Sequence, residues 1–292
     1  MAEAQVVGLL GATSLVGECL ISQLLSSGVS VSAFSRQPVV QQLNPALSWH
    51  SFADAQSDIG PIQQWVCAAP IWVLPEHFAL LEASAARRVV VLSSTSRLTK
   101  TGSADMAEHA TAVRLSEGEA CFKAWADSKS IEWVILRPTL IYGFGRDKNI
   151  AEIARFIRRF GFFPLFGKAE GLRQPIHVQD VAGACRSAIA AQGAPGRTYN
   201  IAGGEILSYH DMVIRIFVAL GRRPRLLPVP LLAFRIAIVV LRCLPRYRQW
   251  SVVMAERMNR DLVFDYGEAS CDLGFEPRAF ALSTEDVEKV KG

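Results

Sequence analysis

The chain has 292 residues, of which half are hydrophobic, and a formal net charge of +4 at neutral pH. This length and composition indicate a globular protein that buries a large core, either as one domain or as a core with a smaller lobe. The small net charge gives no indication of nucleic-acid binding. The absence of any uninterrupted apolar run of about 18 residues argues against a transmembrane segment.

Cysteine usage and the first residues bear on the cellular compartment. No two cysteines form a CxxC pair, so neither a disulfide framework nor a zinc site is indicated. The first residues, Met1 to Gln5, are acidic and precede only a strand-length apolar run, unlike a signal peptide. Both features favour the cytoplasm. The six cysteines are Cys19, Cys67, Cys121, Cys185, Cys243 and Cys271.

The first predicted unit is a strand, a glycine turn and a helix. The apolar run Val6–Leu10 breaks at Gly11 and becomes helix-like by Gly17. Such a turn presents backbone N–H groups and the positive end of a helix to a dinucleotide pyrophosphate. Gly11 is expected to permit the turn, and Gly17 to let the helix pack against the strand. Ser14 stands where a middle glycine usually allows close approach to phosphate, and its hydroxyl is expected to contact that phosphate.

The residue after the second strand decides between the two nicotinamide cofactors. In an NAD site that strand ends in a carboxylate, which binds the ribose 2′-hydroxyl and repels a 2′-phosphate. Here the predicted strand Val29–Phe34 is followed by Ser35 and Arg36. A hydroxyl and a guanidinium suit a 2′-phosphate, so NADP is favoured over NAD. Arg36 as a solvated loop residue is the alternative.

Strand-like and helix-like segments then alternate along the chain. This pattern predicts an α/β fold, with a doubly wound parallel sheet (Rossmann) and a smaller C-terminal lobe. The predicted strands are Val6–Leu10, Val29–Phe34, Leu47–Phe52, Ile71–Leu74, Arg88–Leu92, Trp133–Leu136 and Thr198–Ile201. The predicted helices are Leu15–Ser27, Pro75–Ala86, Ala107–Asp127 and Val181–Ala191.

A strongly basic segment lies near the C-terminal end. Nine arginines and a single acid, Glu256, fall between Arg222 and Arg260. Within it, Arg235 and Arg242 interrupt an apolar stretch and share one helical face. The pattern favours a core helix with a cationic edge, and an interfacial helix in weak contact with a membrane surface is the alternative.

Several motifs, in order, resemble the extended short-chain dehydrogenase/reductases, the NAD(P)-dependent epimerase/dehydratase group. These motifs are Gly11–Gly17, Val89–Thr95, Leu136–Gly143, Gln174–Val181 and Arg197–Ile201. The resemblance implies an NADP-binding core over residues 1–140 and 176–202, and a substrate-binding lobe over 141–175 and 203–292. It also implies a nucleotide-linked sugar or similar small molecule as substrate, and a homodimer through the helix Ala107–Asp127.

The family's proton carrier is a tyrosine with a lysine four residues later, and this chain departs from that pattern. None of its five tyrosines has a lysine at that spacing, and alignment puts Thr111 and Leu115 at the two positions. A threonine hydroxyl has no accessible phenolate-like state near neutral pH. The sequence therefore leaves two functions open. One is an epimerase, dehydratase or reductase with a rearranged or weakened acid/base site, and the other is a non-catalytic NADP-binding sensor or regulatory and assembly protein.

The resemblance also implies particular site residues. Thr95 would take the catalytic Ser/Thr position, and Tyr142 lies near the expected nicotinamide edge. The expected cofactor-binding residues are Gly11, Thr13, Ser14, Leu15, Val16, Gly17, Arg36, Asp54, Ser93 and Pro138.

Overall fold

A computed structural model of the chain describes residues 5–36, 44–52, 60–103, 105–230 and 256–288. Its centre is a seven-stranded sheet in the order β11-β6-β5-β4-β1-β2-β3, in which every neighbouring pair is parallel. The prediction of a doubly wound parallel sheet is confirmed. The strands are β1 (Val6–Leu10), β2 (Ser30–Ser35), β3 (Leu47–Ser51), β4 (Gln64–Cys67), β5 (Arg88–Leu92), β6 (Glu132–Pro138) and β11 (Arg197–Ile201).

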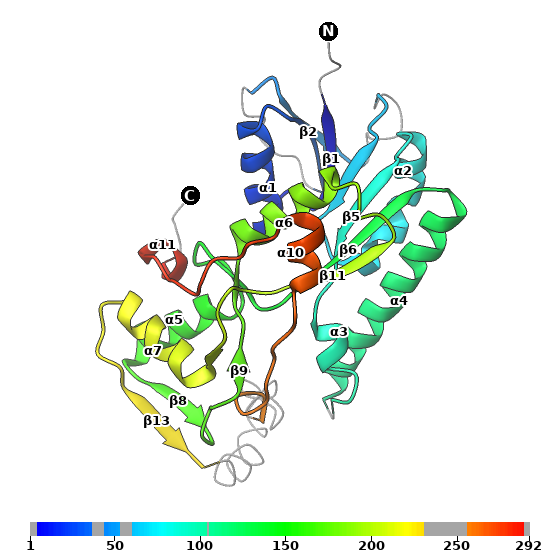
Figure 1. The fold of residues 1–292 in the computed structure, drawn as a ribbon. Helices are drawn as coiled ribbons and strands as arrows, with labels where there is room; N and C mark the ends of the chain where they lie inside the picture. The colour runs from blue at the N-terminus through cyan, green and yellow to red at the C-terminus, as the bar shows by residue number, and fades with distance from the viewer. Residues whose placement is uncertain (1–4, 37–43, 53–59, 104, 231–255, 289–292) are drawn as a thin grey trace.

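Helices cover both faces of the sheet (Figure 1). One apolar cluster joins one face to α1 (Leu15–Ser26), α6 (Val178–Ala190) and α10 (Gly267–Leu273). A second cluster joins the other face to α2 (Phe78–Ala83), α4 (Met106–Ser128) and the 3-10 helix η1 (Ile71–His77). Because both faces are buried, the central strands are almost continuously apolar.

The prediction of a strand at Ile71–Leu74 is wrong. The fourth strand is Gln64–Cys67, and Ile71–His77 forms η1 after the extended residue Pro70. Ile71 and Leu74 are fully buried beneath α4, where Gly118 leaves room for Ile71. A short apolar run satisfies a buried helix as well as a buried strand, so hydrophobicity alone could not separate the two.

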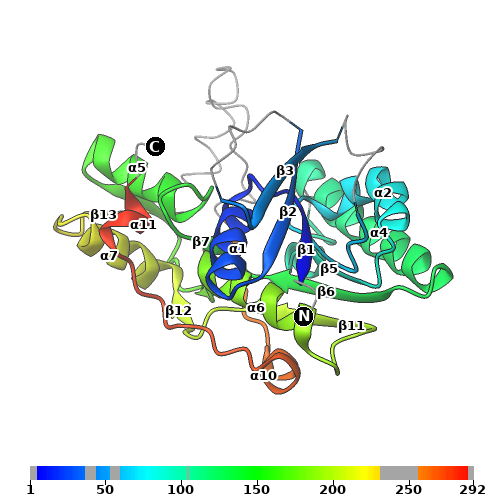
Figure 2. The same cartoon turned by 90° about the horizontal axis from the view of Figure 1, so that it is seen from above.

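The second lobe is built around its own apolar cluster, with contributions from residues 142–169, 207–229, 258 and 280–287. Figure 2 shows this lobe on one side of the sheet in a view from above. Residues 267–275 return to the sheet, since Ala269, Leu273 and Phe275 belong to the first cluster. The lobe's elements are α5 (Ile150–Phe160), β8 (Phe163–Phe166), α7 (Tyr209–Ala219), β13 (Leu226–Val229) and α11 (Thr284–Val287).

Short elements connect the two parts. The connecting elements are α3 (Ser96–Thr99), β7 (Ile141–Tyr142), β9 (Leu172–Arg173), β10 (Ile176–His177) and β12 (Leu207–Ser208).

The region 231–255, which contains much of the basic segment, lies outside the described residues, so its predicted core or interfacial helix stays a prediction. None of the helices in the described ranges is both long and apolar enough to cross a membrane.

A buried carboxylate joins α11 to the core. Asp286 accepts hydrogen bonds from Ser283 and from the Phe144 backbone, and lies 3.2 Å from His177 Nε2. Because His177 Nδ1 accepts from the Gln179 N–H, the ring proton sits on Nε2 and points at Asp286. Burial raises the pKa of Asp286, but these hydrogen bonds outweigh it and lower the pKa to about 2.

We expect Asp286→Ala to lower the free energy of unfolding by about 2–4 kcal/mol, because it leaves the buried His177 and the partly buried donors of Ser283 and Phe144 without their acceptor. Since the folded pKa is depressed, this contribution should be present above about pH 4 and lost as the pH falls towards 2. Urea unfolding at a series of pH values measures both effects. Glu285→Ala, at an exposed neighbour in α11, is the control, and equal effects of the two substitutions would contradict the assignment.

Candidate functional site

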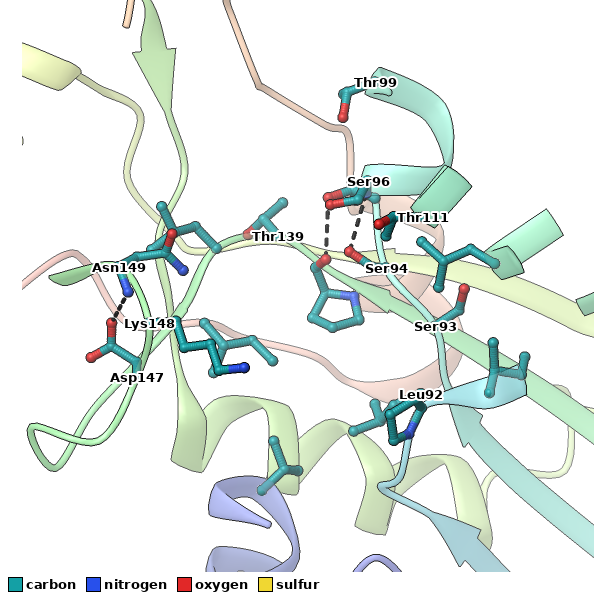
Figure 3. Close-up of a pocket in the computed structure, with 18 of the residues that line it drawn as sticks. Leu92, Ser93, Ser94, Ser96, Thr99, Thr111, Thr139, Asp147, Lys148 and Asn149 are labelled. Carbon is teal, nitrogen blue, oxygen red and sulfur yellow. Dashed lines mark hydrogen bonds between the residues drawn. The ribbon is translucent and has the colours of Figure 1, made fainter. Parts of the chain in front are cut away.

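A cavity of about 620 Å³ lies where the carboxyl ends of the strands meet the second lobe. Residues 14–16 of the first turn and 92–96 after β5 form its core side, and residues 146–149 and 173–174 form its lobe side. Figure 3 shows Lys148 extending into the cavity from the side of Asp147 and Asn149, opposite Ser93 and Thr111. Ligands of open α/β sheets bind at this edge.

The glycine turn has the backbone that its sequence predicts. Gly11 has φ +76°, and a Cβ atom there would lie 2.5 Å from the Ala69 nitrogen. A Cβ on Gly17 would lie 2.4 Å from the Gly11 oxygen, so α1 can approach the turn only with glycine at this position. Ser14 caps α1 by accepting from the Gly17 N–H at 3.0 Å. Its hydroxyl proton remains available to a ligand.

The remaining predicted cofactor residues are distributed around this turn. Ser14, Leu15, Val16, Ser93 and Pro138 line the cavity. Thr13 is exposed in the turn. Arg36 is exposed directly after β2, which pairs with β1 in the register Leu10 to Phe34, so it lies one strand away from the turn. Asp54 lies outside the described residues.

The end of β5 supplies hydroxyl groups to the cavity. Thr95 lines it and is 6% exposed, and its hydroxyl donates to the Pro138 carbonyl at 3.1 Å. In this rotamer Thr95 can accept a hydrogen bond from a ligand but cannot donate one. Ser94 accepts from the Ser96 N–H at 3.1 Å, which holds the turn after the strand.

A buried carboxylate on α4 organises this wall. Glu119 is 2% exposed and accepts from Ser93 Oγ at 2.6 Å and from Arg137 Nε at 2.8 Å. Arg97 Nε lies 3.3 Å from its other oxygen. Desolvation raises the pKa of Glu119, but the bonds from Arg137 and Ser93 outweigh it and lower the pKa. The ionised carboxylate therefore joins α4 to β5, β6 and α3.

The two positions aligned with the family's tyrosine and lysine both face the cavity. Thr111 and Leu115 lie one helical turn apart on α4 and are part of the lining. The Thr111 hydroxyl donates to the Ala107 carbonyl of its own helix at 2.8 Å. As the side chains stand, α4 presents neither a phenol nor an ammonium group at these positions.

Tyr142 occupies a packed position instead of the cavity wall. Its side chain is fully buried in the second-lobe cluster, edge-on to His177 and Phe280. Its hydroxyl lies 3.3 Å from the Ala281 carbonyl. Burial and the charge of Asp286 raise its pKa, which disfavours the phenolate. We therefore assign no proton transfer to Tyr142.

The lobe side of the cavity is strongly cationic. Arg173 lines it although its side chain is 4% exposed, and its guanidinium donates to the carbonyls of Leu172, Arg257 and Arg260. No carboxylate in the described part of the chain pairs with it. Burial, and to a smaller degree the charge of Arg257, lower its pKa to about 10. The charge of Asp261 offsets part of this effect, and a buried cation with no directly paired carboxylate favours an anionic ligand.

Besides Arg173, the cationic residues Lys100, Arg146, Lys148 and Arg257 line the cavity. Arg257 lines the cavity and pairs with Glu108, while Lys100 lines it beside Thr99 at the end of α3. Desolvation and the charge of Arg257 lower the pKa of Lys100. These groups would all be stabilised by an acidic ligand.

Comparison with known proteins shows what this chain is similar to. The sequence model of the "NAD dependent epimerase/dehydratase family" matches residues 79–202. These residues, less than half of the chain, match that family. The resemblance to the extended short-chain dehydrogenase/reductases seen in the sequence is therefore confirmed.

Two curated relatives match parts of this chain. Over 100 residues it is 29% identical to "NADH dehydrogenase [ubiquinone] 1 alpha subcomplex subunit 9, mitochondrial" of Arabidopsis thaliana, covering 34% of this chain and 25% of that protein. Over 121 residues it is 26% identical to the UDP-glucose 4-epimerase of Vibrio cholerae, covering 41% of this chain and 37% of that enzyme. In both cases the match spans less than half of the relative.

Solved structures match the whole fold. UDP-glucuronic acid 4-epimerase from Bacillus cereus, in complex with NAD, superposes with a TM-score of 0.71 at 14% identity, covering 98% of this chain and 97% of that one. UDP-N-acetylglucosamine 4-epimerase from Bacillus cereus gives 0.69 at 16% identity, covering 98% and 94%. At these identities the likeness concerns the fold.

Sequence reasoning missed the cationic wall and the carboxylate beneath the other wall. Arg173 stands between Leu172 and Gln174, and only its place directly before a recognised motif could have drawn attention to it. Arg257 falls within the basic segment, where composition does not single it out. Glu119 reads as an ordinary helix residue, because its partners Ser93 and Arg137 are distant in sequence.

We expect Glu119→Ala to destabilise the protein by about 3–5 kcal/mol, since it leaves Arg137 partly buried without its counter-charge. Glu117→Ala, at an exposed position on the same helix, should change stability by less than about 0.5 kcal/mol. Chemical denaturation of both variants measures the difference. Similar stabilities would show that the carboxylate does not organise the wall.

Proposed function

We propose that this protein binds NADP at the β1–α1 turn and uses the adjoining cavity for a nucleotide-linked sugar or a similar acidic small molecule. One observation carries the proposal: the cavity has the start of α1 on one side and, on the other, the buried cation Arg173, which is held by backbone carbonyls. A helix start suits the cofactor pyrophosphate, and an arginine fork suits the phosphates of a second ligand.

The cofactor would lie along residues 11–17, with its nicotinamide towards Ser93, Thr95 and Pro138. The backbone N–H groups at the start of α1 and the Ser14 hydroxyl would donate to the pyrophosphate. Arg36 would meet the adenosine 2′-phosphate, which favours NADP over NAD. The bound cofactor supplies hydride transfer, and this chain's residues position and desolvate the reacting groups.

Proton transfer is the step for which the cavity is poorly equipped. Thr111 and Leu115 offer no acid/base group, and the Thr95 proton is held by Pro138. We therefore propose an epimerase/dehydratase-like protein whose acid/base site is rearranged or weakened. Thr95 would orient the substrate by accepting a hydrogen bond.

The missing tyrosine and lysine also favour a second candidate. In that function the protein binds NADP without turnover, and cofactor binding controls its stability or its affinity for a partner. In this second function the glycine turn, Arg36 and the cavity would make the same contacts with their ligands as in the enzyme. Cofactor binding without turnover of any nucleotide sugar would select this candidate. A homodimer through α4 also stays a prediction.

Arg36→Ala should lower NADP affinity by about 10- to 100-fold and leave NAD affinity nearly unchanged, because only the 2′-phosphate contact is lost. Isothermal titration of the oxidised cofactors against both proteins measures this. Arg87→Ala, at an exposed arginine beyond the opposite end of the sheet, is the matched control. Equal affinities of the unmodified protein for NADP and NAD would refute the role of Arg36.

Turnover of UDP-sugars should be weak, and Thr111→Tyr with Leu115→Lys should raise it by about a hundredfold or more, because this pair restores a proton carrier and the cation that tunes it. Coupled assays of epimerisation and cofactor reduction over a UDP-sugar panel measure the rates. The control pair, Val113→Tyr with Glu117→Lys, places the same groups on the exposed face of α4 and should not change turnover.

Rates of UDP-sugar turnover can contradict the proposed position of the reacting atoms. Rapid turnover that survives Thr95→Val would show that the reacting atoms lie elsewhere. Melting temperatures of each variant separate a loss of fold from a loss of function.

A further inference from the structure

The end of the second lobe exposes aromatic and aliphatic side chains. Phe160 ends α5 and is 49% exposed, and Phe162, two residues later, is 37% exposed. Leu227 on β13 is half exposed, and β13 pairs with β8, which begins directly after Phe162. The Phe160 ring is supported from below by Phe156, at 4.6 Å between centroids. Figures 1 and 2 both place this end of the lobe away from the sheet.

Arginines surround these apolar side chains. Arg159 lies over the Phe160 ring at 5.2 Å, and Arg222 donates to the carbonyls that end α5. Arg223 and Arg225 are exposed between α7 and β13, and the Arg225 carbonyl accepts from the N–H of Phe163. Within the described ranges, none of these four arginines pairs with a carboxylate. The basic aromatic face consists of Arg159, Phe160, Phe162, Arg222, Arg223, Arg225 and Leu227.

We propose that the basic aromatic face docks on an anionic lipid bilayer. Guanidinium groups attract anionic headgroups, and the exposed rings and Leu227 can enter the boundary between headgroups and acyl chains. The combination of unpaired arginines with exposed large apolar side chains is what distinguishes this surface, because either feature alone is common on soluble proteins.

Charge complementarity favours the bilayer over other partners. A two-fold contact between copies of this face would bring two sets of unpaired arginines together, which is unfavourable. A nucleic acid would pair with the arginines through its phosphates but would leave Leu227 in water. Of these three partners, the lipid interface is the one that accommodates both kinds of side chain.

Docking in this way would leave the cavity accessible. The cavity is lined by residues 92–96, 146–149 and 173–174, and none of the residues of the basic aromatic face belongs to its lining. Membrane attachment and ligand binding can therefore be tested separately, and failure of one leaves the other untouched.

The test is co-sedimentation of the full chain with phosphatidylcholine vesicles and with vesicles containing about a quarter phosphatidylglycerol. We expect at least about tenfold tighter binding to the anionic vesicles, and weaker binding as salt is added. Arg223→Ser with Arg225→Ser should lower this affinity about tenfold. Phe160→Ser with Phe162→Ser should lower binding that persists at high salt.

Arg87→Ser with Arg114→Ser removes two exposed arginines from the sheet domain and is the matched control for charge. An equal loss with this control, or equal binding to both vesicle types, would overturn the proposal. The proposal would also be overturned if the chain bound no vesicles. The same holds if vesicle binding depended on the arginines but was unchanged in the phenylalanine variant and in Leu227→Ser. Tighter binding to an oligonucleotide, or a dimer that these variants dissociate, would assign the surface to a different partner. Melting temperatures identify any misfolded variant, and Leu227→Ser offers the mildest change.

Discussion

The ionised carboxylate of Glu119 is the constraint on which the core side of the cavity depends. It is buried, so the protein must supply every group that balances its charge. Arg137 comes from β6, Arg97 from α3 and the Ser93 hydroxyl from the end of β5. These contacts fix the position of α4 relative to the strand ends, and with it the distance between Thr111 on the helix and Thr95 after β5. A cavity wall made of three separate elements thereby behaves as one unit.

The opposite wall has the reverse electrostatic character. Arg173 is held by carbonyl oxygens, which satisfy its N–H groups but do not neutralise its charge. Arg257 and Lys100 add to this charge, while Glu108 offsets part of it. An anion bound there would offset part of the cost of burying this positive charge. The charge of this wall therefore favours an acidic ligand, whether or not a proton is transferred in the cavity.

The parts of the fold that could be predicted from the sequence are those determined by local chemistry. Gly11 and Gly17 mark the first turn because no side chain fits there, and the apolar strands show in the hydrophobic pattern. The strand at Gln64–Cys67 was missed because the neighbouring run Ile71–Leu74 is just as apolar but lies under α4 in a 3-10 helix. The charged partners of Glu119 and the isolation of Arg173 depend on contacts between distant segments. No local pattern in the sequence indicates these contacts. Tyr142 is the opposite case: its sequence position suggested a place near the nicotinamide, but its side chain is buried in a packed core.

The position of positive charge bears on how much of the family's chemistry this chain retains. In the family pattern a lysine on the long helix tunes the tyrosine beside the nicotinamide, whereas Leu115 makes this part of the wall apolar. The cations that line this cavity are instead Lys100, Arg146, Lys148, Arg173 and Arg257, and under the proposed function they would meet the substrate phosphates. Charge in that place increases binding of the ground state and the transition state alike, and uniform binding does not raise kcat. Under the proposed function, this distribution of charge strengthens ligand binding and supplies no proton carrier at Thr111 or Leu115.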